Sequence, residues 1–218
     1  EYCYATEDRM GARPFDWIDT MEDIAEAKKD ADRVIVLYHG GKEYCPYPSP
    51  RLRKVCQAMV HKGADLVICQ HSHCVGCYEL YQNTHILYGQ GNFHYTEPCD
   101  KEVWFTSLAV HYDTRENTVS FTPLRAGEYS IRLAEDAEDI LEQLALRSEK
   151  LRDGRWRAEW HAFCESVRQN YRDAVRKAFV DGATPREDEM FGHYLDCEAH
   201  SDVWRELYAT WWHTQSPE

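Results

Sequence analysis

Three clusters of chemically versatile residues stand directly after apolar segments of this sequence. The first runs His-Gly-Gly-Lys-Glu from His39 to Glu43. The second is His71-Ser72-His73, and the third is Gly91-Asn92-Phe93. Imidazole nitrogens bind Zn, Mn or Fe and also carry protons, and glycines let the backbone pass close to a ligand. The three clusters therefore predict a metal-binding or proton-transfer site.

Each cluster taken alone also has a structural explanation. A single histidine at the end of a strand is more often a hydrogen-bonded structural residue, and Gly91-Asn92 is equally typical of a turn. In an extended chain, however, His71 and His73 would point the same way and could face one site. Taken together, the clusters favour one site. Its candidate metal ligands are His39, His71 and His73, and its candidate catalytic groups are His39, Glu43 and Asn92. The backbone at Gly40, Gly41 and Gly91 is the candidate for binding a ligand.

The elements that would position these residues alternate between strand and helix patterns. The continuous apolar runs Val34–Tyr38 and Leu66–Cys69 are typical of strands covered on both faces. Helical patterns begin near Pro14 and at Pro50. Because ligand sites of open α/β sheets lie beyond the carboxyl ends of the strands, we expect the first two clusters to meet at one sheet edge.

The remainder of the chain changes character twice. Alternating runs at Val103–Tyr112 and Thr118–Leu124 predict an antiparallel hairpin. From about Ala134 we expect three helical stretches, broken near Gly154 and across Gly182–Pro185. The predicted fold class is α/β, a layered sheet core with an antiparallel hairpin and a helical C-terminal extension. We place the core domain at residues 1–130 and the extension at 131–218.

Several motifs, in their order and spacing, resemble the CapA family of bacterial capsule and poly-γ-glutamate synthesis proteins. They cover roughly residues 5–95, under half of the chain. The motifs are Ala5–Arg9 with Gly11-Ala12, Val34–Val36, His39–Tyr44, Tyr47–Pro50, Gly63–Ile68, His71–His73, Glu79 and Tyr88–Phe93. The resemblance implies the C-terminal part of a domain with the calcineurin-like metallophosphoesterase fold.

The resemblance also implies a metal centre. The late motif of two-metal phosphoesterases, Gly-His-x-His, reads Gln70-His71-Ser72-His73 here, with glutamine in place of glycine. By this match His39 and His71 would bind one divalent ion and His73 the other, whereas Glu43 and Asn92 match positions without an assigned role. The complete protein would hold two ions of Zn, Mn or Fe. The acidic ligands are expected before Glu1, so this chain alone should bind metal poorly or not at all.

Three functions remain open from these residues. The first is a metal-dependent hydrolase, phosphoesterase-like, that serves capsule or poly-γ-glutamate synthesis and acts on an anionic polymer or a phosphoester. The second is a binding or assembly component that keeps the fold without catalysis. The third is a small zinc-stabilised module built on Cys74 and Cys77, with His71 and His73 nearby. In the first two cases we expect a partner, either the N-terminal remainder of the domain or another chain.

Composition narrows the partners and the compartment. A net charge of −13 argues against nucleic acid and anionic membranes as partners, and no apolar run approaches the roughly 20 residues that span a bilayer. Nine cysteines, dispersed except for Cys74 and Cys77, suggest free thiols in a reducing, cytoplasmic setting. Because the sequence opens on Glu1 rather than Met, a membrane anchor or an extracytoplasmic location stays open.

The predicted C-terminal helices are rich in tryptophan. The helical spacing of Trp156, Trp160 and Phe163 favours a core between helices, and a carbohydrate- or partner-binding surface that includes Trp211 and Trp212 is the alternative. The scattered histidines of this region are predicted to be structural: His193, His200 and His213.

Overall fold

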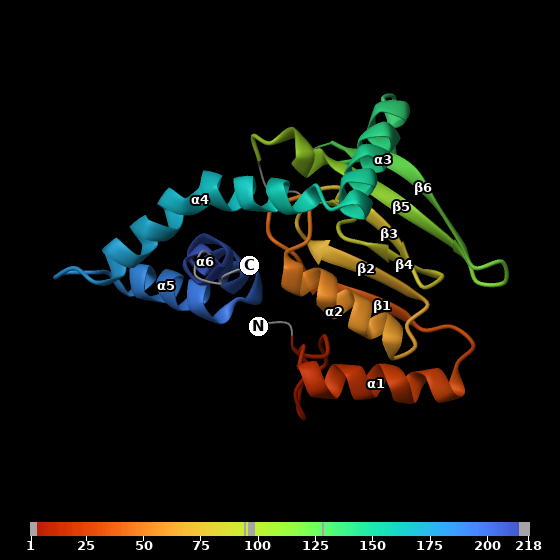
Figure 1. Cartoon of the computed structure of the whole chain (residues 1–218), viewed down its shortest axis with the longest axis horizontal. Helices are drawn as coiled ribbons and strands as arrows, with labels where there is room; N and C mark the ends of the chain where they lie inside the picture. Colours follow the sequence, from red (N-terminus) through yellow and green to blue (C-terminus); the bar gives the residue numbers. More distant parts are fainter. Residues whose placement is uncertain (1–3, 94, 96–98, 128, 214–218) are drawn as a thin grey trace.

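The chain folds as a mixed α/β core followed by a helical extension (Figure 1). The computed structural model describes residues 4–93, 95, 99–127 and 129–213, and the side chains of the last helix up to Tyr208. The predicted α/β fold class, with its antiparallel hairpin and C-terminal helices, is confirmed. The side chains of Trp211, Trp212 and His213, for which the sequence made predictions, lie outside the described residues.

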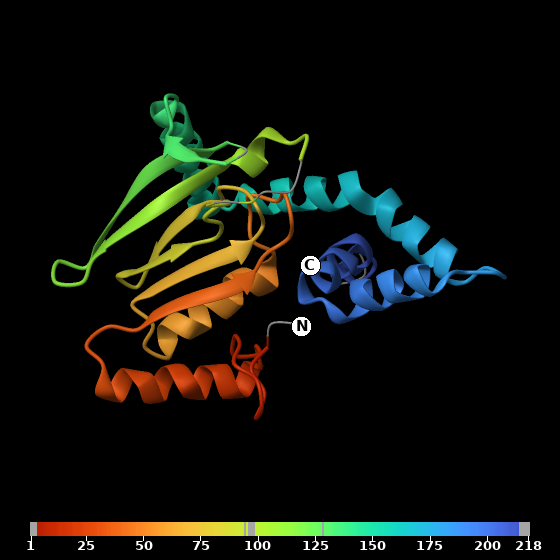
Figure 2. The same cartoon turned by 180° about the vertical axis from the view of Figure 1, so that it is seen from behind.

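A four-stranded mixed sheet forms the centre of the core. Its strands run in the order β1 (Ile35–Gly40), β2 (Leu66–His71), β4 (Thr84–Leu87) and β3 (Tyr78–Tyr81). The first three are parallel, and β3 is antiparallel to β4. The parallel strands therefore present their carboxyl ends at one edge. This edge faces the last two helices of the extension, α5 (Pro185–Asp196) and α6 (Glu198–His213) (Figure 2).

Two helices cover one face of this sheet, and their sequences explain where they begin. In α1 (Trp17–Asp30) the Asp16 side chain caps the helix by accepting hydrogen bonds from the first-turn backbone. In α2 (Pro50–His61) Ser49 is the cap and Pro50 stands in the first turn, where its missing N–H costs nothing. Both helices bury an apolar stripe against the sheet.

The second sheet covers the other face. It consists of β5 (Thr106–Asp113), β6 (Thr118–Ala126) and β7 (Ile131–Leu133), all antiparallel, with a short 3-10 helix at Glu102–Phe105 before β5. Its apolar side chains join those of β2, β4 and the first extension helix in one cluster; the buried members are Leu66, Ile68, Val75, Leu87, Leu108, Ala134, Ile140 and Leu144. The last strand of this sheet thus lies just beyond residue 130.

One expectation about the central sheet is wrong. The run Val34–Tyr38 was predicted to be covered on both faces, but Ile35 is 48% exposed and Leu37 is 68% exposed in β1. These side chains share a face with Leu66 and Ile68 of β2, which the second sheet covers. The second sheet therefore covers β2 and leaves the same face of β1 open. No strand among the described residues pairs with the outer edge of β1.

The extension contains one helix more than predicted among the residues that the structure describes. It comprises α3 (Ala137–Asp153), α4 (Trp156–Ala178), α5 (Pro185–Asp196) and α6 (Glu198–His213). The breaks near Gly154 and at Gly182–Pro185 are where they were expected. The additional break falls at Cys197, whose backbone is extended (φ −71°, ψ 121°). Neither glycine nor proline stands at Cys197, so the sequence had no obvious turn signal there.

Tryptophan side chains pack the extension against the core, as predicted. Trp160 is fully buried and Trp156 is 5% exposed, and both join the cluster that α1, α2 and the central sheet form. A polar contact adds to this attachment, because the buried Asp202 of α6 accepts hydrogen bonds from Ser49 and Arg51 of the core. No helix in the described part of the chain is long and apolar enough to cross a membrane.

Candidate active site

The first two histidine clusters meet at the carboxyl ends of β1 and β2. The strand register pairs His39 with Gln70 and Gly40 with His71. The Nε2 atom of His39 lies 3.1 Å from the Nδ1 atom of His71, and the ring centroids are 4.9 Å apart. Adjacent parallel strands thus bring together two imidazoles that are 32 residues apart in sequence.

The other ring nitrogen of His71 is buried without a well-aligned hydrogen-bond partner. Its nearest carboxylate is Glu43, with 3.3 Å between His71 Nε2 and Glu43 Oε1, and His71 also contacts the thiol of Cys197. The Cys197 contact and the Glu43 carboxylate outweigh burial and raise the pKa of His71 to about 9. His71 has φ +87°, a backbone conformation that is rare for residues other than glycine.

The pKa values of two neighbours of His71, namely His39 and Glu43, are lowered rather than raised. Burial and the nearby imidazoles of His71 and His73 lower the pKa of His39. Burial alone would raise the pKa of Glu43, but contacts with His71 and Lys42 together hold it well below its usual range. The pair at the strand ends therefore combines a histidine that favours the neutral form with one that favours the charged form.

His73 and Asn92 form a separate pair beside the first. The Nδ1 atom of His73 lies 2.8 Å from Oδ1 of Asn92, whose amide nitrogen donates to the backbone oxygen of Trp104. The ring of His73 stacks on Trp104 at 4.5 Å and is 6.0 Å from the ring of His71. Because both His71 and His73 have positive φ, the chain is not extended there, and the two imidazoles bond different partners.

The three predicted glycines have two kinds of surroundings. Gly40 and Gly41 line a cavity next to His39 and His71, and Gly41 has φ +125°. Gly91 has φ +78° and lies against β5, where an added Cβ would come within 2.2 Å of the Thr106 oxygen. The structure therefore gives Gly91 a packing role, and only the first two are placed to meet a ligand.

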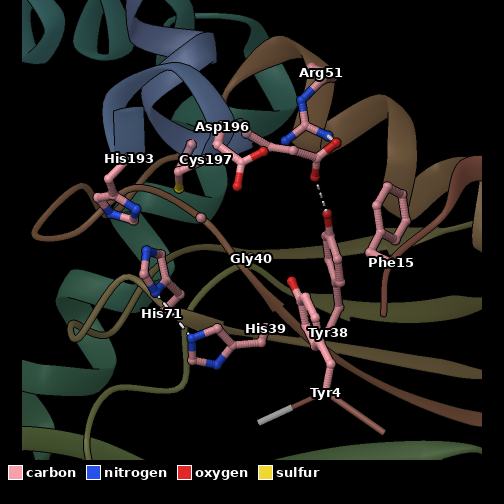
Figure 3. Close-up of a pocket in the computed structure, with 13 residues that line it drawn as sticks. Tyr4, Phe15, Tyr38, His39, Gly40, Arg51, His71, His193, Asp196 and Cys197 are labelled. Atoms are coloured by element: carbon pink, nitrogen blue, oxygen red, sulfur yellow. Dashed lines mark hydrogen bonds and ion pairs between the residues drawn. The ribbon is translucent and has the colours of Figure 1, made fainter. Parts of the chain in front are cut away.

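The cavity has a volume of about 570 Å³ and opens above the two strand ends (Figure 3). The sheet contributes His39, His71 and Tyr38, and α2 contributes Arg51. The opposite wall comes from the junction of α5 and α6; its members are His193, Asp196, Cys197, Glu198 and Ala199. The extension thus builds part of the site rather than standing apart from it.

Sequence reasoning missed that second wall. Burial raises the pKa of the Cys197 thiol, but the contact with His71 and the backbone N–H groups of His200 and Ala199 outweigh burial and lower it below its ordinary value. A signal was present in the spacing His193-x-x-x-Cys197-x-x-His200, which repeats at four and three residues. In a predicted helix such spacing places three metal-binding side chains on one face.

The described residues supply only part of the two-metal centre that the resemblance implies. His39 and His71 could be two ligands of one ion, but His71 meets His39 through Nδ1 and Glu43 through Nε2, its opposite nitrogens. The three residues therefore do not face a single point, and His73 is directed at Asn92. Burial raises the pKa of the Cys74 thiol to about 11 and that of the Cys77 thiol well above its usual value. Neither cysteine belongs to a group of three metal-binding side chains among the described residues.

Comparison with known proteins relates most of this site to one family. Residues 2–96 match the family model described as bacterial capsule synthesis protein PGA_cap. The chain is 32% identical over 139 residues to the PGA biosynthesis protein CapA of Bacillus subtilis (strain 168), which covers 62% of the chain and 36% of the relative. It is 32% identical over 117 residues to the capsule biosynthesis protein CapA of Bacillus anthracis, and this match covers 52% of the chain and 28% of that relative. The chain thus spans about a third of the length of these relatives.

Proposed function

Residues 2–96 belong to the family of bacterial capsule synthesis proteins that includes CapA, and from this premise we propose that the chain acts in capsule or poly-γ-glutamate synthesis. The observation that carries the proposal is that the matched residues include both members of the His39–His71 pair and open onto the cavity. Ligand sites of α/β sheets commonly occupy this position beyond the strand ends.

The chemistry that we propose for the complete protein is hydrolysis of an anionic polymer or a phosphoester. Imidazoles at the cavity floor can hold or transfer a proton next to a bound substrate, and Arg51 lines the same cavity. A divalent metal would activate water and offset negative charge. His39 and His71 supply at most two of its ligands, so the other ligands would have to come from residues that the structure does not describe.

The proposal is tested on the complete protein, by metal analysis and by hydrolysis of poly-γ-glutamate and of a generic phosphodiester. His71→Ala should reduce bound metal and hydrolysis together. The matched control is His111→Ala, because His111 is exposed on β5 and its side chain bonds only Thr122 among the described residues. Hydrolysis that survives His71→Ala would contradict the proposed chemistry.

A non-catalytic assembly role is the second candidate, and one observation favours it. His39 and His71 are hydrogen-bonded to each other, so the described residues alone leave neither imidazole wholly free for a substrate. An assembly component would bind poly-γ-glutamate without cleaving it. Retained polymer binding, with no hydrolysis and no metal in the complete protein, would decide for this role.

The open edge of β1 supports the proposed partner. Ile35 and Leu37 are exposed side chains of β1, and the outer edge of β1 pairs with no other described strand. Apolar side chains and free backbone groups in such a place favour pairing with a further strand. We propose that the remainder of the domain, or another chain, supplies it. The outer-edge amides of β1 should then exchange hydrogen quickly in residues 1–218 and slowly in the complete protein.

A further inference from the structure

Three metal-binding side chains converge where α5 ends and α6 begins. One ligand atom from each of His193, Cys197 and His200 lies within 4.8 Å of the other two. Among the residues that the structure describes, no other set of three histidine, cysteine or acidic side chains meets this condition. The cluster lies beyond residue 96, outside the part that matches the capsule synthesis family.

The break between the two helices creates this arrangement. His193 stands in the last turn of α5, Cys197 in the extended link, and His200 in the first turn of α6. The Cys197 backbone N–H donates to the His193 oxygen at 3.0 Å, and its oxygen accepts from Ser201 at 2.9 Å. Both helix ends are thereby closed around the thiol, which fixes its place between the two imidazoles.

The side-chain contacts leave ligand atoms available. The Nδ1 atom of His200 lies 2.7 Å from the Tyr171 hydroxyl, and both residues are buried. Since Nδ1 is engaged, the Nε2 atom of His200 is the one that can bind a metal. Histidine ligands in metal sites commonly hold their second nitrogen in this way, which fixes the tautomer and the ring orientation.

We propose that His193, Cys197 and His200 bind one zinc ion. One thiolate and two imidazoles are ligands that Zn²⁺ prefers over oxygen-seeking ions such as Mg²⁺ or Ca²⁺. Bonds of about 2.0–2.3 Å in a tetrahedral site hold ligand atoms about 3–4 Å apart. The exposed His193, at the end of its helix, can supply the small movement that closes the cluster.

Three protein ligands leave the fourth position of the zinc open toward the cavity. Cys197 and His193 line that cavity, and His71 lies across it from Cys197 (Figure 3). Zinc sites with three protein ligands hold water or a substrate atom at the fourth position. The ion would therefore present an exchangeable position to whatever occupies the cavity. This site does not depend on the proposed function.

The test uses the 218-residue chain, stripped of metal and titrated with Co²⁺ as a spectroscopic probe for zinc. We expect one equivalent to bind with a thiolate-to-cobalt charge-transfer band and tetrahedral visible absorption, and zinc to displace it. Cys197→Ser should abolish the band. His193→Gln changes an exposed residue and should weaken binding about tenfold or more, and Tyr171→Phe about 10–100-fold.

Two controls separate this site from other cysteines and from the strand-end histidines. Cys99→Ser removes a thiol elsewhere in the chain, and His39→Ala removes the partner of His71; both should keep the band. Circular dichroism of each metal-free variant checks that it is folded. Cobalt binding without a thiolate band, or a band that persists in Cys197→Ser, would overturn the proposal. So would binding unaffected by His193→Gln.

Discussion

The Nε atom of Arg51 lies 2.8 Å from the Oδ1 atom of Asp202, which joins the first turn of α2 to α6 across 151 residues of sequence. The Asp202 side chain is only 4% exposed, and it also accepts from the Ser49 hydroxyl at 2.5 Å. The same Ser49 hydroxyl caps α2 by accepting from the Leu52 backbone N–H at 3.0 Å. One carboxylate thus holds the extension against the core beside the cavity.

Replacing this carboxylate should destabilise the whole chain. Asp202→Ala leaves the Arg51 guanidinium without its buried partner, and we expect a loss of about 3–5 kcal/mol of unfolding free energy. The matched control is Asp173→Ala, because Asp173 pairs with Arg176 on the surface of α4. That change should cost no more than about 1 kcal/mol. Urea unfolding measures both, and equal losses would contradict a special role for Asp202.

A tryptophan comparison tests the attachment of the extension through its apolar face. Trp160→Ala removes a fully buried side chain whose indole N–H donates to Glu206 at 3.0 Å, and should cost about 3–5 kcal/mol. Trp17→Ala removes the same side chain where it is 44% exposed and should cost clearly less. Thermal unfolding followed by circular dichroism compares the two. If both variants melted alike, the extension would not share the core with the sheet.

Alanine substitutions at two glycines with similar backbone conformations distinguish backbone strain from steric clash. Gly91 and Gly154 have φ +78° and +90°, so alanine at either position is strained by about 1–2 kcal/mol. An added Cβ at Gly91 meets the Thr106 oxygen at 2.2 Å, whereas the one at Gly154 meets nothing within 4 Å. Gly91→Ala should therefore destabilise the chain by about 1–3 kcal/mol more than Gly154→Ala does. Denaturant midpoints give the comparison, and similar values would remove the proposed close contact with β5.

The stability of the core should fall in acid because of Asp65. Burial would raise the pKa of Asp65, but hydrogen bonds from Lys28, the Val34 backbone and Arg33 lower it. A lowered pKa in the folded chain contributes stability above the unfolded value of about 3.9, and that contribution is lost as the pH falls through the folded value.

The variant that tests this effect is Asp65→Asn. Near neutral pH it should be less stable than the parent chain, and the difference should shrink as the pH is lowered below about 4. Urea unfolding across this range measures the difference. A difference that stays constant with pH would show that the Asp65 charge does not stabilise the fold.

Local signals in the sequence were sufficient for most of the elements. The helix starts near Pro14 and at Pro50 were predicted from local backbone rules, which hold whatever packs on the helix. The meeting of His39 and His71 followed from two parallel strands ending at one edge. These inferences needed only neighbouring residues or one pairing of strands.

The remaining features depend on contacts that are distant in sequence. An apolar run reports hydrophobicity but not how far the second sheet extends, so the exposure of Leu37 could not be predicted from it. The break at Cys197 has no glycine or proline, and it depends on how α5 and α6 pack against α4. The spacing of His193, Cys197 and His200 was a local signal that the sequence prediction did not use, but the turn at Cys197 that brings the three together had no signal of its own.

The uncovered edge of β1 has a consequence for the chain in isolation. Exposed strand edges with apolar side chains are templates for aggregation, because a second molecule can supply the missing hydrogen bonds. Two copies can join their β1 edges around a twofold axis, which continues the sheet from one molecule into the next and covers Leu37 in both. Self-association of residues 1–218 should accordingly rise with concentration, and Leu37→Lys should suppress it while leaving the cavity residues in place.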